Sequence, residues 1–299
     1  MSPPFALRLT DAVTARESQI VLGLDPDPAR PWPAAAAAGE GPGSPAARAA
    51  RVVAEHCRLL IAAAGPACVA VKLQLACFER LGAAGWAALA EVAGVARAAG
   101  LLVIADGKRG DVPVTAAAYA QALATATPTV VGEVDGLGAD AFTANPLLGV
   151  DALEPFIASG AGVFVLVRTS NAGAGDVQDL TLASGEPLWE RLAQIVAGLG
   201  TVRACGLTDV GAVIGATAPA HLARARELMP HTVFLLPGVG AQGGRVEALA
   251  PAFAPGPAGG LVSASRSIER AYAEHGGEPA DAALAEAERL RGLAWSMRG

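Results

Sequence analysis

The sequence predicts an α/β fold in which eight parallel strands alternate with helices and close into a (β/α)8 TIM barrel. Eight short apolar segments alternate along the 299 residues with segments of helical spacing. Most of these apolar segments are continuous, as in strands that are buried on both faces of a parallel sheet. Polar residues follow the ends of several segments, and in a barrel all of those ends open onto one face. An open, doubly wound sheet is the alternative.

The expected elements cover most of the chain. Residues 29–50 are rich in Ala, Pro and Gly, which disfavours a regular element and predicts a flexible insertion. Residues 1–299 are otherwise expected to form a single barrel domain. Asp281 is suited to the N-cap of the last helix. The predicted strands are 19–24, 68–72, 101–106, 139–143, 162–167, 212–216, 232–236 and 259–263, and the predicted helices are 46–64, 78–99, 115–126, 189–198 and 281–295.

Composition and charge exclude several classes of protein. The net charge of −6 argues against a nucleic-acid-binding surface or an anionic-membrane partner. No apolar run reaches the roughly 18 residues of a transmembrane helix, and the N-terminus lacks the pattern of a secretory signal. The four cysteines lack CxxC spacing and the four histidines are scattered, so we expect reduced thiols, no metal site and a cytoplasmic protein.

Residues 104–111 contain the most informative cluster of charges. Asp106, Lys108 and Asp111 follow the third predicted strand, and side chains two apart on a strand point the same way. Only two of the 22 basic residues are lysines, Lys72 and Lys108. Lysine can give up a proton whereas arginine cannot, so Lys108 is a candidate proton donor. The alternative is a buried ion pair that stabilises a turn.

Lys72 and Asp25 follow other predicted strands and would join this cluster in a barrel. Alternating charges can satisfy one another in a partly buried site, and an ammonium group there can stabilise negative charge that develops on carbon. The same lysine can then deliver a proton to that carbon.

Two further segments predict ligand contacts. The glycine-rich residues 237–244 follow the seventh strand, and Ser265 and Arg266 follow the eighth, where barrels commonly bind phosphate. Tight turns around a surface arginine are the alternative. The run Thr169-Ser170-Asn171 after the fifth strand suits either hydrogen bonding to a heterocycle or an ordinary ST-turn.

The ordered motifs of the chain resemble those of the orotidine 5′-phosphate decarboxylase family, in its longer, type 2 subfamily. Asp106-Gly-Lys108-Arg-Gly-Asp111 matches the Asp-x-Lys-x-x-Asp pattern of that family. This pattern alone is only moderately specific, because sister barrels share it, whereas the ordered set is highly specific. The other matching segments are Leu22-Gly-Leu-Asp25-Pro, Val71-Lys72-Leu-Gln-Leu-Ala-Cys-Phe78-Glu79, Asn145-Pro-Leu-Leu-Gly149, Arg168-Thr-Ser170-Asn171, Gly211-Ala-Val-Ile-Gly-Ala-Thr217 and Pro237-Gly-Val-Gly-Ala-Gln242-Gly-Gly.

The resemblance implies conversion of orotidine 5′-phosphate to UMP and CO2, with no metal and no organic cofactor. Asp25 would bind a ribose hydroxyl, and Lys72 would bridge the ribose and Asp106. Asp106 would lie beside the scissile carboxylate, and Lys108 would protonate C6 of the pyrimidine.

The remaining implied roles concern the rest of the nucleotide and a second subunit. Ser170 would contact the pyrimidine, and Gln242 and Arg266 would hold the 5′-phosphate, with Gln242 also near the base. Asp111 and Thr115 would reach into the neighbouring subunit's site, so the active unit would be a homodimer with shared active sites.

Two rivals remain. Sugar-phosphate lyases and synthases of the sister barrels resemble metal enzymes with a carboxylate ligand after the second strand, where this chain has Lys72, which would repel a cation. The second rival is a protein that binds a phosphate ligand without catalysis, although retaining a charged network without turnover would be costly.

Overall fold

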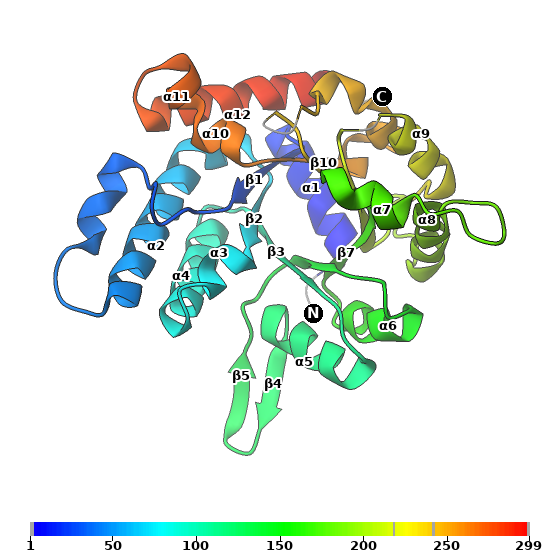
Figure 1. Ribbon diagram of the computed structural model, residues 1–299, viewed down its shortest axis with the longest axis horizontal. Helices are drawn as coiled ribbons and strands as arrows, with labels where there is room; N and C mark the ends of the chain where they lie inside the picture. The colour runs from blue at the N-terminus through cyan, green and yellow to red at the C-terminus, as the bar shows by residue number, and fades with distance from the viewer. Residues whose placement is uncertain (1–2, 218, 241–242, 298–299) are drawn as a thin grey trace.

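The computed structural model describes residues 3–217, 219–240 and 243–297, and it confirms the predicted barrel (Figure 1). Eight parallel strands close in the order β1-β2-β3-β6-β7-β8-β9-β10, with β10 pairing with β1. Each predicted strand overlaps one barrel strand within about two residues at its start. The barrel strands are β1 Ile20–Leu24, β2 Ala70–Gln74, β3 Leu102–Arg109, β6 Ala141–Ala144, β7 Gly162–Arg168, β8 Val210–Ile214, β9 Phe234–Pro237 and β10 Gly260–Ala264.

Helices surround most of the barrel, and none of those described is long and apolar enough to cross a lipid bilayer. The described residues between β9 and β10 form 3-10 turns and loops, because this segment is rich in proline and glycine. The α-helices are α1 Phe5–Arg16, α2 Pro45–Ala64, α3 Leu75–Glu79, α4 Ala83–Ala98, α5 Pro113–Leu123, α6 Val150–Ala158, α7 Gly175–Gln178, α8 Leu188–Leu199, α9 Pro219–Leu228, α10 Arg266–Glu269, α11 Ala271–His275 and α12 Pro279–Ser296. The 3-10 helices are η1 Pro33–Gly39, η2 Gly65–Ala67, η3 Ala172–Ala174, η4 Val246–Ala248, η5 Ala250–Phe253 and η6 Pro257–Gly259.

Several helix boundaries differ from the prediction. The helix expected over 78–99 is divided into α3 and α4 at Gly82, whose φ of 65° a helix cannot accommodate. Asp281 is not the N-cap of α12: Glu278 occupies that position and Asp281 lies in the first turn, where a carboxylate still complements the helix dipole. The helices α6 and α9 were not predicted.

The expectation that residues 29–50 lack a regular element is wrong for residues 33–39, whereas α2 begins within one residue of the helix predicted over 46–64. Residues 33–39 form the 3-10 helix η1, and α2 begins at Pro45, with the Ser44 side chain accepting a hydrogen bond from the Ala47 backbone N–H. The side chains of Arg48 and Arg51 donate to the carbonyls of Gly39 and Ala38, at the end of the 3-10 helix, and Arg51 also donates to the carbonyls of Glu40 and Pro42 beyond it.

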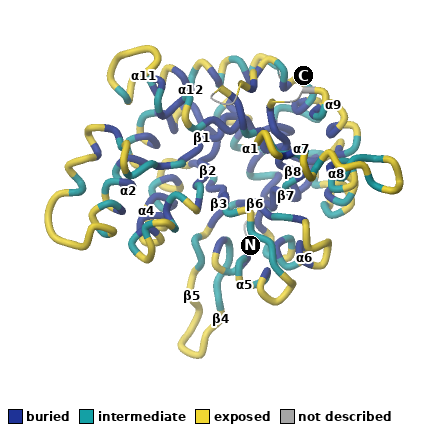
Figure 2. The backbone as a smooth tube through the Cα atoms, in the orientation of Figure 1, coloured by how far each residue is buried: buried dark blue, intermediate teal, exposed yellow. Residues whose placement is uncertain are grey.

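A two-stranded antiparallel hairpin, absent from the prediction, lies outside the barrel. Its strands are β4 (Ala126–Thr129) and β5 (Gly132–Asp135), and it projects from the molecule beside α5 (Figure 1). Its residues are largely exposed, whereas the barrel strands are buried (Figure 2). The predicted helix over 115–126 therefore ends early, at Leu123.

The core consists of two layers. The larger layer lies between the barrel and its helices, and the smaller layer fills the barrel interior and extends onto α1. Phe5 of α1 is 1 % exposed and its ring meets that of Phe164 edge to face, with centroids 5.9 Å apart. Gly162 lies against the same ring, because a Cβ there would approach Phe5 to 2.4 Å. Helix α1 therefore packs closely against the barrel.

We expect Phe5→Ala to destabilise the protein by about 3–5 kcal/mol, because the cavity would lie between α1 and the barrel interior. Urea denaturation followed by circular dichroism measures the change. Val130→Ala in the exposed hairpin is the control and should change stability by less than about 0.5 kcal/mol. Equal effects of the two substitutions would contradict the role of α1.

Candidate active site

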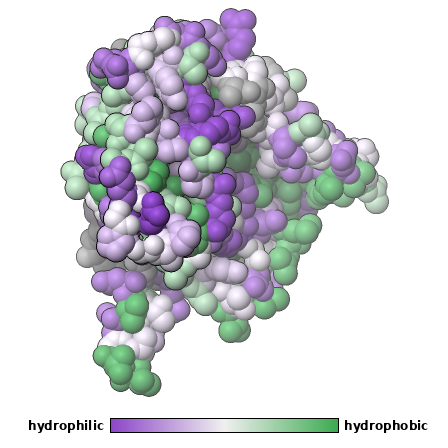
Figure 3. Space-filling view, turned by 60° about the vertical axis from the view of Figure 1, so that its left-hand side comes forward, coloured by the Kyte–Doolittle hydropathy of each residue, from purple (hydrophilic) through white to green (hydrophobic). Residues whose placement is uncertain are grey.

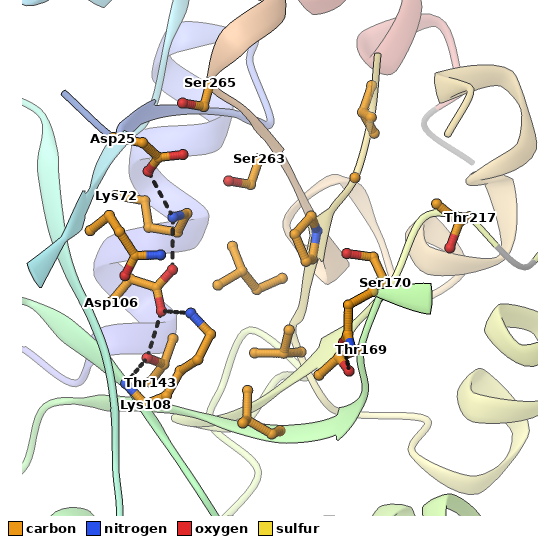
Figure 4. Close-up of a pocket in the computed structure, with 18 of the residues that line it drawn as sticks. Asp25, Lys72, Asp106, Lys108, Thr143, Thr169, Ser170, Thr217, Ser263 and Ser265 are labelled. Atoms are coloured by element: carbon orange, nitrogen blue, oxygen red, sulfur yellow. Dashed lines mark hydrogen bonds and ion pairs between the residues drawn. The ribbon is translucent and has the colours of Figure 1, made fainter. Parts of the chain in front are cut away.

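A cavity of about 890 Å³ lies where the C-terminal ends of the barrel strands meet (Figure 4). Most of the residues singled out from the sequence line it, together with others that were not. The lining residues are Asp25, Lys72, Gln74, Asp106, Lys108, Thr143, Leu166, Thr169, Ser170, Asn171, Ala172, Gln178, Val213, Thr217, Leu235, Pro237, Gly238, Val239, Ser263, Ser265 and Arg266.

Four charged side chains form a continuous array on one wall of the cavity (Figure 4). Asp106 accepts hydrogen bonds from both lysines: Lys72 Nζ lies 2.7 Å from Oδ2, and Lys108 Nζ lies 2.6 Å from Oδ1. Lys72 Nζ also lies 3.6 Å from Asp25 Oδ1, which is an ion pair but too long for a hydrogen bond. Within the described structure Asp25 Oδ1 is buried and accepts no hydrogen bond.

Burial and charge act in opposite directions on this array. Burial by itself opposes the charge of Lys72, but the carboxylates of Asp106 and Asp25 outweigh it and raise the pKa of Lys72. Burial likewise favours the neutral form of Asp106, but Lys72 and Lys108 together hold the pKa of Asp106 well below its ordinary value. The array therefore contains an ionised aspartate and a protonated buried lysine.

The Lys108 side chain is the most accessible member of the array, followed by Asp25 at 35 % exposed. It is 42 % exposed, against 8 % for Lys72 and 6 % for Asp106, so its ammonium group can meet a ligand in the cavity. Its φ is 48°, in the left-handed region that a non-glycine residue adopts only when its surroundings enforce it. The pairing of β3 with β6 also shifts register between Ala105 and Arg109. The side chains of Asp106 and Lys108 therefore meet because of this irregular backbone as well as the alternation of a regular strand.

Thr143, which sequence reasoning missed, supports this backbone. Its hydroxyl donates to Asp106 Oδ1 at 2.9 Å and accepts from the Lys108 backbone N–H at 2.8 Å. Thr143 is 1 % exposed and lies at the end of β6. Thr143 is the polar last residue of the predicted strand 139–143, but nothing local in the sequence indicates that it meets Asp106.

Polar groups from the segment after β7 form the opposite wall (Figure 4). Gln178 Oε1 accepts from the Thr169 backbone N–H at 2.8 Å, and Gln178 Nε2 donates to Thr169 Oγ1 at 3.0 Å. Ser170 lies against Gly215, where a Cβ would approach the Ser170 Cα to 2.8 Å. Gln178 was not singled out from the sequence, because nothing local connects it to Thr169.

The predicted phosphate residues lie at another edge of the cavity. Ser265 and Arg266 both line it, and Ser265 Oγ is buried with no hydrogen-bond partner in the described structure. Gly23 of β1 permits this position, because a Cβ there would approach the Ser265 Cβ to 2.6 Å. Gln242, predicted to contact the phosphate, lies outside the described residues.

Asp111 and Thr115 do not line the cavity. Thr115 is exposed and Asp111 is partly exposed, on the segment between β3 and α5. The Asp111 carboxylate accepts a hydrogen bond from the Val112 backbone N–H, which is a local contact. Among described residues, no group of three or more His, Cys, Asp or Glu is arranged to hold a metal ion.

Comparison with known proteins gives a consistent result. The model of the "Orotidine 5′-phosphate decarboxylase / HUMPS family" matches residues 18–275. Proteins named orotidine 5′-phosphate decarboxylase from Deinococcus radiodurans and Rhodopirellula baltica are 40 % and 41 % identical to this chain. The first alignment covers 98 % of both chains, and the second covers 90 % of this chain and 89 % of the relative.

Solved structures agree. The putative orotidine 5′-phosphate decarboxylase of Streptomyces avermitilis is similar with a TM-score of 0.78 and 31 % identity, over 99 % of this chain and 97 % of that one. The OMP decarboxylase of Leishmania donovani is similar with a TM-score of 0.73 and 33 % identity. That alignment covers 98 % of this chain and 99 % of the Leishmania chain. On the extent of the family match and the identity of these relatives, the chain belongs to the orotidine 5′-phosphate decarboxylase / HUMPS family.

Proposed function

We propose that this chain decarboxylates orotidine 5′-phosphate to UMP and CO2 in pyrimidine biosynthesis. The observation that carries the proposal is the pairing of two ammonium groups with one buried carboxylate, Asp106, in a cavity that also contains Ser265 and Arg266. Such a cavity presents cations to a reacting carbon and, separately, a site for an anion. The names of the relatives support the same activity.

The substrate is held at three places. Arg266 and Ser265, with Gln242, bind the 5′-phosphate, since a guanidinium group and a hydroxyl both donate to phosphate oxygens. Asp25, whose side chain is 35 % exposed, accepts a hydrogen bond from a ribose hydroxyl. Ser170 donates to the pyrimidine from the opposite wall.

The chemistry follows from the position of Lys108. The bond from C6 to the carboxylate breaks, CO2 leaves, and the electron pair remains on C6 in the ring plane, where the π-system cannot delocalise it. The ammonium group of Lys108 stabilises this pair electrostatically and then transfers a proton to C6. Lys72 and Asp106 orient that ammonium group, and Asp111 from a neighbouring subunit completes the array. No metal or organic cofactor has a step in this reaction.

The proposed active unit is a homodimer in which Asp111 and Thr115 of one subunit enter the cavity of the other. Eight of the thirteen large hydrophobic residues exposed in the described part of the chain lie between residues 112 and 150, which supports an interface there. Figure 3 shows apolar atoms at the end of the projecting hairpin. The eight residues are Val112, Val114, Val130, Val131, Val134, Leu147, Leu148 and Val150.

We place this dimer in the cytoplasm, with the chain acting as one barrel domain. The four cysteines are free thiols, in keeping with a reducing compartment.

Purified protein should consume orotidine 5′-phosphate in the presence of EDTA, followed by the change in absorbance of the pyrimidine. Lys108→Ala should lower turnover by at least about 10³-fold, because both the stabilising charge and the proton are lost, while UMP binding persists. Lys108→Arg is the matched control: it keeps the charge but cannot release a proton, so turnover should stay low. A wild type that is inactive or needs a divalent ion would refute the proposed function.

Mixing Lys108→Ala and Asp111→Ala subunits, each inactive alone, should restore some activity. In a hybrid dimer one cavity carries neither substitution, so about a quarter of all sites recover at equal mixing with free exchange. Activity measured after verified subunit exchange tests this. The absence of any recovery would argue against shared active sites.

Stability should depend on pH through the charged array. The folded-state pKa of Asp106 is lowered, so the contribution of Asp106 to folding stability is present above about pH 4 and declines as the pH falls. The folded-state pKa of Lys72 is raised, so the contribution of Lys72 to folding stability is present below about pH 10 and declines as the pH rises.

Asp106→Asn should therefore destabilise the protein by about 3–5 kcal/mol at pH 7, because Lys72 loses its principal partner. This difference from the wild type should narrow by about 1.4 kcal/mol per pH unit below pH 4. Urea midpoints between pH 7 and pH 3 measure it, with Asp135→Asn in the exposed hairpin as control. A difference independent of pH would contradict the assignment.

A further inference from the structure

A buried hydrogen-bonded cluster lies behind the phosphate end of the cavity, and none of its members lines that cavity. It contains Trp32, His56 of α2 and Glu269 of α10, which are 3 %, 2 % and 4 % exposed. Glu269 is the last residue of the four-residue helix that begins with Arg266. The cluster therefore joins a segment after β1, a helix on the outside of the barrel and the helix that carries Arg266.

The contacts define the role of each group. The backbone N–H of Trp32 donates to His56 Nδ1 at 3.1 Å, so the proton of the neutral imidazole lies on Nε2. His56 Nε2, which carries that proton, lies 3.3 Å from Glu269 Oε1. The indole N–H of Trp32 donates to the backbone carbonyl of Glu269 at 2.9 Å. Both the side chain and the main chain of Glu269 are thus held from outside α10.

Helix α10 has little to hold it in place by itself. Four residues are too few for a stable helix, and the Ser265 side chain makes no capping hydrogen bond. On the cavity side Ser265 abuts Gly23, which limits movement inward. Within the helix the Glu269 N–H donates to the Ser265 carbonyl at 2.9 Å, so Glu269 is connected directly to the start of the helix.

A second connection runs parallel to this one. Arg270 Nη2 donates to the backbone carbonyl of Arg30 at 3.1 Å and to Glu269 Oε1 at 3.3 Å. The segment that follows Asp25 and the segment that carries Arg266 are therefore fastened to each other at two places.

We propose that His56 and Trp32 are positioning residues for phosphate binding, acting through Glu269 to hold α10 so that Ser265 and Arg266 face the phosphate. This inference rests on the proposed function, because it takes the ligand to be a nucleoside 5′-monophosphate. Loosening the cluster lets Arg266 move away from the phosphate, while Lys72, Asp106 and Lys108 on β2 and β3 remain in place.

The test compares the affinities for UMP and uridine, measured by calorimetry on the full-length protein. His56→Leu removes the acceptor of the Trp32 N–H and the polar contact with Glu269, and it should weaken UMP binding about tenfold, with uridine binding unchanged. Trp32→Phe removes only the indole donor and keeps the ring, so it should weaken UMP binding about threefold to tenfold. Trp32→Phe also keeps the proposal testable if the His56→Leu variant does not fold.

His56→Gln, which retains an acceptor and a donor, should recover most of the UMP affinity. Val53→Ala is the matched control, because it creates a cavity in the same helix, one turn away, and removes no polar group. It should leave the ratio of UMP to uridine affinity unchanged.

The possible failures are distinct. A wild type that does not prefer UMP to uridine would refute the nucleotide site itself. The positioning role would be overturned if the wild type prefers UMP and the folded Trp32→Phe and His56→Leu variants keep the same preference. Equal losses of UMP and uridine affinity would also overturn it, since they indicate a general structural effect.

Discussion

The site depends on one carboxylate shared by two ammonium groups. Asp106 is buried, and without Lys72 and Lys108 its charge would be expensive to remove from water. The same dependence applies to Lys72, which is buried more deeply than Lys108. Each charge is tolerated because the others are fixed at hydrogen-bonding distance. The barrel supplies that precision, since adjacent strand ends hold the three side chains.

Close approaches between backbone segments shape the rest of the cavity. Gly23 and Gly215 lie where Ser265 and Ser170, on loops after other strands, come too near for any Cβ. In each case the glycine is required for space and not for an unusual φ. Opposite walls of the cavity therefore each depend on a glycine that leaves room for a serine. A single methyl group at either glycine would displace a predicted ligand-binding serine.

The two parts of the site are held in place in different ways. The charged array lies on barrel strands, whose hydrogen-bonded neighbours hold them on both sides. The proposed phosphate end lies on a four-residue helix whose last residue, Glu269, contacts Trp32 and His56 outside the cavity. This division suits a reaction in which binding energy from a remote phosphate is used at the reacting carbon.

The sequence by itself determined the barrel and the charged array. Strands buried on both faces must be continuously apolar, so all eight were visible locally, and the polar residues that follow them converge in any closed parallel barrel. Only the tertiary structure decided the role of Thr143, the hairpin, the ordered helix η1 and the cluster behind α10. Thr143 meets Asp106 across 37 residues and Trp32 meets Glu269 across 237. Contacts of that kind leave no periodic or local pattern, because they depend on where separate strands and helices bring the chain.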